Sequence, residues 1–306
     1  MLCIPRLRCS GAFPFRECVA LVLLVFLFLG CSGENGSEGT EKVKAGRKET
    51  VRIVYVDWAS ERASAHVVKT VLEQRLGREC ELLDVTLIAM WQALAAGDQD
   101  ASVAAWLPSL QDRFQEKHGS EVVNLGPNLK GTRIGLVVPE YVPVDSITEL
   151  SEHAERFDHK IIGIDPHAGL MKKTGQALEA YDLGTLELVS GSGSTMTTAL
   201  EQAVAQKDWI VVTGWTPHWM FARWDLKYLH DPRNVYGDAE HISTIARKGL
   251  QKDMPRVYAF LDNFFWSPED MAEVMLKAQA NETSYEEAAE EWVNNHENQV
   301  SAWLNQ

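Results

Sequence analysis

The feature that most constrains this 306-residue chain is a weak internal repeat. Residues 53–108 and 160–217 each contain a β-like segment, a helix-like segment, a second β-like segment, a methionine followed by another helix, and a Trp-x-Pro sequence. The spacing also matches, at 33 positions in the first copy and 31 in the second, measured from Asp57 to Met90 and from Asp165 to Met196. Strands that alternate with helices of this length indicate parallel βαβ units, so the repeat predicts two α/β lobes.

Two further strand-like segments connect the copies. Residues 132–141 lie between them, and residues 241–249 follow the second copy. The first segment can carry the chain into the second lobe and the other can bring it back. We therefore expect an α/β fold of two βαβ lobes joined by two crossover strands, with residues 51–135 plus 245–306 in lobe 1 and residues 136–244 in lobe 2. Paired lobes of this kind close around small ligands by a hinge movement.

Three tryptophans, Trp58, Trp106 and Trp215, stand where a short apolar β-like run ends. Ligands of open α/β sheets bind at the carboxyl ends of strands, so three indole rings are predicted at the ligand edge. One tryptophan in such a place is usually part of the core, but three in equivalent places favour a shared role. An indole face attracts a cation that cannot donate hydrogen bonds, which predicts a receptor for a methylated ammonium compound.

The N-terminal segment has the pattern of a signal peptide. Three arginines precede an apolar run over residues 18–30, which is short for a permanent membrane-spanning helix. The run stops at Cys31, in a sequence that resembles the bacterial lipoprotein processing box. We expect residues 1–30 to be removed, Cys31 to be lipidated, and the polar residues 31–50 to form a flexible tether. The folded part is then expected in the periplasm or at the outer face of the cytoplasmic membrane, held there by its lipid anchor.

Charge and cysteine content argue against several classes of function. The formal net charge is −14, and the predicted signal peptide contributes +2, which leaves the mature chain near −16. Such an acidic chain disfavours nucleic acid as a partner. Cys80 is the one cysteine beyond Cys31, so no disulfide is expected in the folded part. We find no nucleophile with a base and no metal-ligand spacing, and we expect no enzyme activity, cofactor or metal site.

Six segments carry a resemblance to a known family: AWLP (105–108), GLVVPEY (135–141), GIDPHAGLM (163–171), GWTPHWMF (214–221), DLKYLHDP (225–232) and RKGLQKDMP (247–255). From Val51 onward the chain resembles the substrate-binding component of glycine betaine ABC transporters, the family typified by the OpuA binding protein, with a type II periplasmic-binding-protein fold. The resemblance implies capture of glycine betaine or a similar quaternary ammonium osmolyte, for osmoprotection. A permease and an ATPase are the implied partners.

The resemblance also implies roles for single residues. In this family three tryptophans form a prism around the trimethylammonium group, and the matching positions are Trp58, Trp106 and Trp215. Backbone N–H groups in the turn after the GIDP strand hold the ligand carboxylate, and these correspond to Gly169 and Leu170. A turn that enters a helix presents unpaired N–H donors and the positive end of the helix dipole, both suited to an anion.

One position departs from the family pattern. Members have a histidine five residues after the tryptophan of WLP, as a further donor to the carboxylate, and this chain has Gln111 there. A glutamine amide donates neutrally and more weakly than a charged donor. The family's GIDPG turn reads GIDPH here, so we hypothesise that His167 replaces the missing donor; otherwise His167 is an exposed turn residue. The hypothesis predicts that His167→Ala weakens binding markedly and that Gln111→Ala hardly matters.

Alternative functions remain open at this point. An aromatic cage discriminates weakly among diffuse cations, so proline betaine, choline, carnitine and a sulfonium osmolyte are alternative ligands. Loss of the family histidine favours a ligand without a carboxylate, which would not need that donor. The lobe pair can also serve as a sensory module that signals to a membrane partner. Neighbouring permease and ATPase genes would favour transport over sensing.

Overall fold

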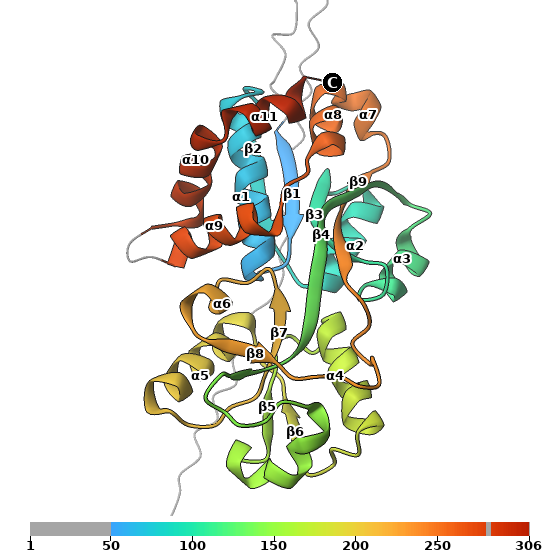
Figure 1. Cartoon of the computed structure of the whole chain (residues 1–306). Helices are drawn as coiled ribbons and strands as arrows, with labels where there is room; N and C mark the ends of the chain where they lie inside the picture. The colour runs from blue at the N-terminus through green and yellow to red at the C-terminus, as the bar shows by residue number, and fades with distance from the viewer. Residues whose placement is uncertain (1–49, 280–282, 306) are drawn as a thin grey trace, which may run out of the picture. The chain divides into compact units, whose positions relative to one another are not determined.

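Nine strands form one curled sheet in the computed structural model, which describes residues 50–279 and 283–305 (Figure 1). The predicted signal peptide, the lipidation site Cys31 and all but the last residue of the tether lie outside the described residues. No helix among the described residues has the length and apolar character needed to cross a membrane. The sheet has two halves, and both contain the 18-residue strand β4 (Val122–Pro139).

The first half of the sheet has the strand order β2-β1-β3-β9-β4. The other four strands are β1 (Val51–Tyr55), β2 (Cys80–Asp84), β3 (Ala101–Leu107) and β9 (Glu240–Arg247). Strand β1 pairs in parallel with β2 and β3, and β9 runs antiparallel to β3 and β4. Parallel neighbours need a crossover connection, which is supplied by α1 (Ala59–Gln74) and α2 (Leu87–Ala96).

The second half repeats this arrangement with the order β4-β7-β5-β6, and β8 also pairs with β4. Its strands are β5 (Lys160–Ile162), β6 (Glu187–Val189), β7 (Val212–Thr216) and β8 (Leu226–Tyr228). Strand β5 is parallel to β6 and β7. The crossover helices are α4 (Gly169–Ala180) and α5 (Gly193–Gln206). The two copies of the repeat therefore build two βαβ lobes, as the sequence predicted.

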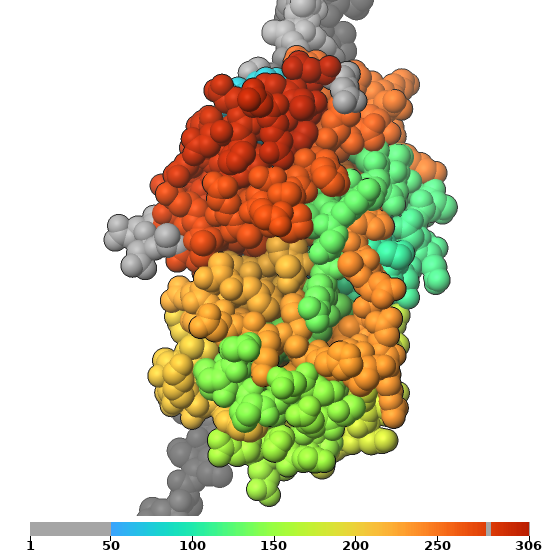
Figure 2. Space-filling view, viewed as in Figure 1, coloured from blue at the N-terminus to red at the C-terminus, as the bar shows by residue number. Residues whose placement is uncertain are grey.

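Strand β4 passes from one half of the sheet to the other between two consecutive residues. Thr132 pairs with Glu240 of β9, and Arg133 pairs with Thr216 of β7. Register shifts along the β4–β9 ladder bend the strand before this point. The expected crossover in both directions is confirmed, because β4 enters the second half and the chain returns to the first half as β9. In Figure 2 the lobes touch, and β4 (green) is visible running from one to the other. The lobe boundaries given above stay a prediction.

Two hydrophobic layers cover the first half of the sheet. Ile53 and its neighbours pack with Val67 and Val71 of α1, whereas Val54 packs with Leu87 and Trp91 of α2. Successive residues of a strand point to opposite faces, so a strand covered on both faces is apolar throughout. This explains why β1 (VRIVY) is apolar at every position except the exposed Arg52, and the strand ends three residues before Trp58.

The C-terminal helices pack on the first lobe, where those over residues 268–279 and 285–295 lie against α1 (Figure 1). The remaining helices are α3 (Asp112–His118), η1 (Ile147–Phe157), α6 (Met220–Arg223), α7 (Leu250–Asp253), α8 (Pro255–Asn263), α9 (Pro268–Gln279), α10 (Tyr285–Asn295) and α11 (Glu297–Leu304). Trp292 lies between Trp266 and Trp303, with ring centroids 5.5 and 5.8 Å away. These three tryptophans are buried and belong to the core, not to the cleft.

Candidate ligand-binding site

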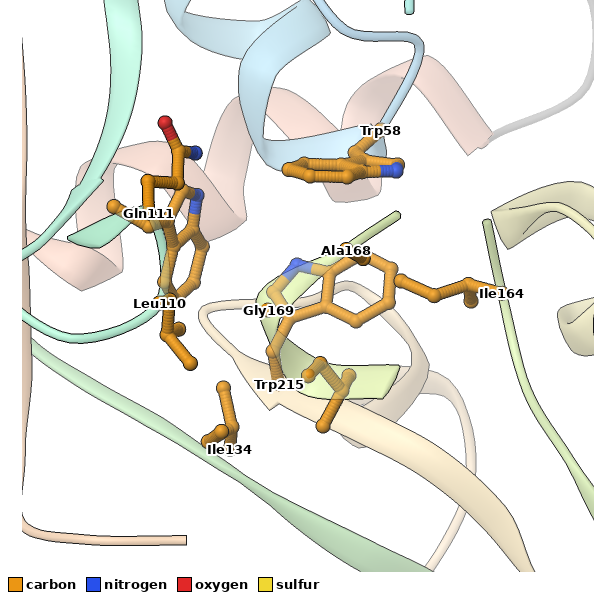
Figure 3. A pocket seen from close by; sticks show the side chains of 10 residues that line it. Trp58, Leu110, Gln111, Ile134, Ile164, Ala168, Gly169 and Trp215 are labelled. Atoms are coloured by element: carbon orange, nitrogen blue, oxygen red, sulfur yellow. The ribbon is translucent and has the colours of Figure 1, made fainter. Parts of the chain in front are cut away.

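A cavity lies between the lobes, and the three strand-end tryptophans line it. Figure 3 shows Trp58 and Trp215 among its lining side chains. Trp58 follows β1 and Trp106 belongs to β3, both in the first lobe, whereas Trp215 belongs to β7 in the second. Trp106 and Trp215 are each 4% exposed, and Trp58 is half-buried. The other lining residues are Leu110, Gln111, Ile134, Ile164, Ala168, Gly169 and Leu170. The structure thus brings together the three tryptophans that the sequence placed at strand ends.

Two of the indole rings are fixed by the first turn of α1. The Trp106 indole N–H donates to Oε1 of Glu61 at 2.5 Å, and the Trp215 indole N–H donates to the Ser60 hydroxyl at 3.1 Å. The Ser60 hydroxyl in turn donates to Oε2 of Glu61 at 2.6 Å. One buried carboxylate therefore orients rings that come from both lobes. Ser60 and Glu61 were not predicted from the sequence, where their only signal was their place just after Trp58 at a helix start.

The N-terminus of α4 lies at another wall of the same cavity. Gly169 and Leu170 are its first two residues, and no described residue accepts a hydrogen bond from their backbone N–H groups. The residue before the helix, Ala168, has no side chain that could cap them. Free N–H donors and the positive end of the helix dipole favour an anionic group at this place.

The lobes are in contact beside the cavity. The Arg113 guanidinium donates to the backbone carbonyl of His167 at 3.0 Å, and Lys172 of α4 pairs with Asp112 of α3 at 3.1 Å. A Cβ atom added to Gly169 would lie 2.3 Å from the Leu110 carbonyl oxygen, so the two backbones approach closely here. The structure therefore corresponds to a closed arrangement of the lobes.

Gln111 and His167 occupy different environments. Gln111 is buried and lines the cavity, where its side-chain carbonyl accepts from the Trp91 indole N–H at 2.8 Å and its amide donates to the Ala104 carbonyl at 3.2 Å. His167 is exposed and is not among the lining residues, and its backbone N–H donates to the Asp165 carboxylate. The geometry thus favours Gln111 over His167 as a residue that faces a ligand, contrary to the sequence-based hypothesis, which still awaits a binding measurement.

His218 supports the cage from behind Trp215. Its ring meets the Trp215 ring edge to face, with centroids 4.5 Å apart, and its Nδ1 accepts a hydrogen bond from the backbone N–H of Met220 at 3.1 Å. Burial lowers the pKa of His218 to about 3, so the imidazole is neutral at physiological pH. His218 therefore adds no positive charge beside the Trp215 ring.

Reactive groups are sparse in the part of the chain that the structure describes. No group of three or more His, Cys, Asp or Glu side chains in these residues is placed to hold a metal ion. Cys80 is buried at the start of β2, and burial raises the pKa of its thiol to about 12. A thiol with this pKa is not a nucleophile near neutral pH, so Cys80 serves as a small core residue.

Two α/β lobes that enclose an aromatic cavity, with a helix N-terminus at its wall, define the class of periplasmic-type substrate-binding proteins. The family model of the substrate binding domain of ABC-type glycine betaine transport systems matches residues 49–295. The chain belongs to this family, as the sequence motifs indicated.

Similar proteins agree with this membership. GbuC of Listeria monocytogenes, a glycine betaine/carnitine transport binding protein, is 47% identical over 163 residues, which are 53% of this chain and 53% of GbuC. The match thus spans about half the length of that relative. The closed structure of lactococcal OpuAC in complex with glycine betaine is 42% identical, with a TM-score of 0.79, over 84% of this chain and 99% of OpuAC. The structure of ProX from Borrelia burgdorferi, a glycine betaine/L-proline-binding protein, is 37% identical, with a TM-score of 0.80, over 84% of this chain and 97% of ProX. These similarities confirm the type II fold.

Proposed function

We propose that this chain is the substrate-binding lipoprotein of an ABC importer and that it captures glycine betaine, or a similar quaternary ammonium osmolyte, between its lobes. One observation carries the proposal: Trp58, Trp106 and Trp215 converge on a cavity whose wall includes the free N–H groups of Gly169 and Leu170. Glycine betaine has a trimethylammonium group at one end and a carboxylate at the other. The arrangement offers a partner for each end.

The energetics of such a site are sufficient for useful affinity. A desolvated cation-π contact contributes on the order of 2 kcal/mol, so three indole rings contribute roughly 6 kcal/mol before the cost of ordering. Hydrogen bonds to a charged group add about 1.5–3 kcal/mol each. Micromolar binding corresponds to about 8 kcal/mol, which the cage and the two N–H donors together can supply.

The partners and the location follow from the family. Family members are extracytoplasmic substrate-binding components of ABC transporters, and we infer that a permease and an ATPase receive the ligand from the closed lobes. The lipid anchor at Cys31 is proposed from the sequence alone, because it lies outside the described residues. Binding and delivery need no chemistry on the ligand, so we also infer that the chain is not an enzyme. Recovery of chemically intact ligand after long incubation would support that inference.

Titration calorimetry with glycine betaine, choline and carnitine tests the proposed substrate. We expect the protein without residues 1–30 to bind glycine betaine with micromolar or tighter affinity. Choline should bind at least about tenfold more weakly, because it lacks a carboxylate and leaves the N–H groups of Gly169 and Leu170 unpaired. If choline or carnitine bound more tightly than glycine betaine, the result would support the aromatic cage but indicate a different substrate. Binding of none of the three would contradict the proposed function.

A pair of alanine variants tests which residue completes the site. From the geometry we expect Gln111→Ala to weaken glycine betaine binding by about tenfold, because it removes a cavity wall and leaves the buried Trp91 indole N–H without its acceptor. His167→Ala should change affinity less than about twofold, because that side chain is exposed. Thermal unfolding of both variants separates loss of binding from loss of fold. The reverse order of effects would restore the hypothesis that His167 is the donor.

A further inference from the structure

Glu61 is a buried acid that has no cationic partner in the part of the chain that the structure describes. Among the described residues, Glu61 and Asp100 are the two acids with at most 1% of their surface exposed. Asp100 pairs with the Arg247 guanidinium at 2.7 Å, whereas no described basic side chain forms an ion pair with Glu61. An unpaired buried carboxylate is costly, and such groups concentrate at functional sites. The position of Glu61 therefore needs an explanation beyond packing.

The hydrogen bonds of Glu61 lead directly to the aromatic cage. One carboxylate oxygen accepts the indole N–H of Trp106, and the other accepts the hydroxyl of Ser60, which itself accepts the indole N–H of Trp215. A charged acceptor makes these bonds short and directional. It also polarises the donor, and this increases the electron density of the indole ring. A ring with more electron density attracts a cation on its face more strongly.

We propose that Glu61 is a positioning residue of the cage and the counter-charge of the bound ligand. Its carboxylate orients and polarises the Trp106 ring directly and the Trp215 ring through Ser60. The ammonium group of the bound ligand is then the cationic partner of Glu61. This inference rests on the proposed function and deepens it. It assigns the cation specificity of the site to a residue behind the rings as well as to the rings themselves. A purely aromatic cage would need no such charge.

The charge of Glu61 changes near neutral pH. Burial raises the pKa of Glu61 to about 7, and its hydrogen bonds with Ser60 and Trp106 limit the rise. Asp57 and Arg62, at the same end of α1, pair with each other. Three other titratable side chains near the rings are neutral in this range, because burial sets the pKa of Tyr285 near 12, of His66 near 4 and of His218 near 3.

Linkage then fixes the sign of the pH dependence. A bound cation favours the ionised form of Glu61, so binding lowers the pKa of this carboxyl and releases protons. Affinity should be highest above pH 7 and should fall as the pH drops through the pKa of the ligand-free protein. We expect a loss of about tenfold from about pH 8.5 to about pH 5.5, and release of about 0.4 proton per ligand at pH 7. The carboxylate of glycine betaine stays ionised throughout this range.

The test is calorimetry with glycine betaine across this pH range, in two buffers of different ionisation enthalpy. Glu61→Gln should bind about tenfold more weakly than the unmodified protein at about pH 8.5, should match it at about pH 5.5, and should release no proton. The loss by mutation and the loss by acid should be equal, because both measure the coupling between one carboxylate and one cation. Glu73→Gln, the same change on the same helix but away from the cavity, should keep the full pH profile.

The variant Ser60→Ala and a measurement of thermal unfolding test the role of Glu61 independently. Ser60→Ala removes the link to Trp215 but keeps the carboxylate, so it should weaken binding and preserve proton release. At about pH 8.5 Glu61→Gln should melt at a higher temperature than the unmodified protein, because it removes an ionised buried group. An affinity independent of pH would overturn the role of Glu61, and so would a Glu61→Gln variant that binds as tightly as the unmodified protein at about pH 8.5.

If glycine betaine did not bind at all, the proposed substrate would be wrong, and the same series with choline would test Glu61. If choline did not bind either, both the proposed function and the role of Glu61 would be overturned.

Discussion

Trp215→Ala is expected to weaken glycine betaine binding by at least about 100-fold. The substitution removes one desolvated cation-π contact, which is on the order of 2 kcal/mol, and it also removes the ring that the second lobe contributes to the cage. A second hollow also borders Trp215, and Asp57 and Arg62 are among its lining residues. Without the ring the two spaces would join and water would reach the ammonium group. Truncation of such a central aromatic anchor costs about 2–4 kcal/mol or more in binding free energy.

Calorimetry of two substitutions at this position separates the causes. Trp215→Phe keeps an aromatic face but loses the hydrogen bond to Ser60, so it should lie between the unmodified protein and Trp215→Ala, with a loss of about tenfold. Trp303→Phe, a change of the same kind in the core of the first lobe, should leave affinity nearly unchanged. Binding by Trp215→Ala within tenfold of the unmodified protein would remove Trp215 from the proposed cage.

Gly169→Ala is expected to abolish tight binding while each lobe stays folded. The added Cβ atom would lie 2.3 Å from the carbonyl oxygen of Leu110 and 2.7 Å from its Cα atom, and both are backbone atoms of the other lobe. Gly169 is the first residue of α4, where alanine fits a helix at least as well as glycine. The clash therefore exists only when the lobes are closed. We expect at least a 100-fold loss of affinity for glycine betaine, because the closed state is the one that buries the ligand.

Small-angle X-ray scattering shows whether closure itself is lost. Glycine betaine should reduce the radius of gyration of the unmodified protein and leave that of Gly169→Ala unchanged. Gly175→Ala is the matched control, because it lies in the same helix and an added Cβ atom there meets nothing within 4 Å. Its binding and its closure should be normal. Normal closure and affinity in Gly169→Ala would show that the Leu110 segment can move aside at little cost.

Much of the architecture was predictable because it is encoded locally. The mostly apolar residues of β1 and the apolar positions of α1 identify a buried strand and its covering helix without any knowledge of the fold. The same pattern returns in β5 and α4, which predicted a second lobe. The carboxyl ends of parallel strands meet at one edge of a sheet. Tryptophans that end such strands could therefore be assigned to a common cavity.

The partners behind the cage were not predictable, because they are far apart along the chain. Trp106 and Glu61 are 45 positions apart, and Trp215 and Ser60 are 155 apart. No local pattern distinguishes Glu61 from an ordinary acid in the first turn of a helix. The hypothesis that His167, rather than Gln111, is the further donor to the ligand carboxylate also relied on nearness in sequence. His167 is close to Gly169 in sequence, but the turn leaves its side chain exposed, whereas Gln111 reaches the cavity from the other lobe.

The sequence by itself therefore determined the two α/β lobes, the family and the three tryptophans that line the cavity, because apolar periodicity and strand ends are properties of short segments. The tertiary structure alone decided how these rings are held and how closely the lobes meet. Burial of Glu61 and the approach of Gly169 to Leu110 arise only when α1, β3, β7 and α4 are brought together. The physical reason is that burial, pKa and steric contact depend on neighbours in space, whereas periodicity depends on neighbours in sequence.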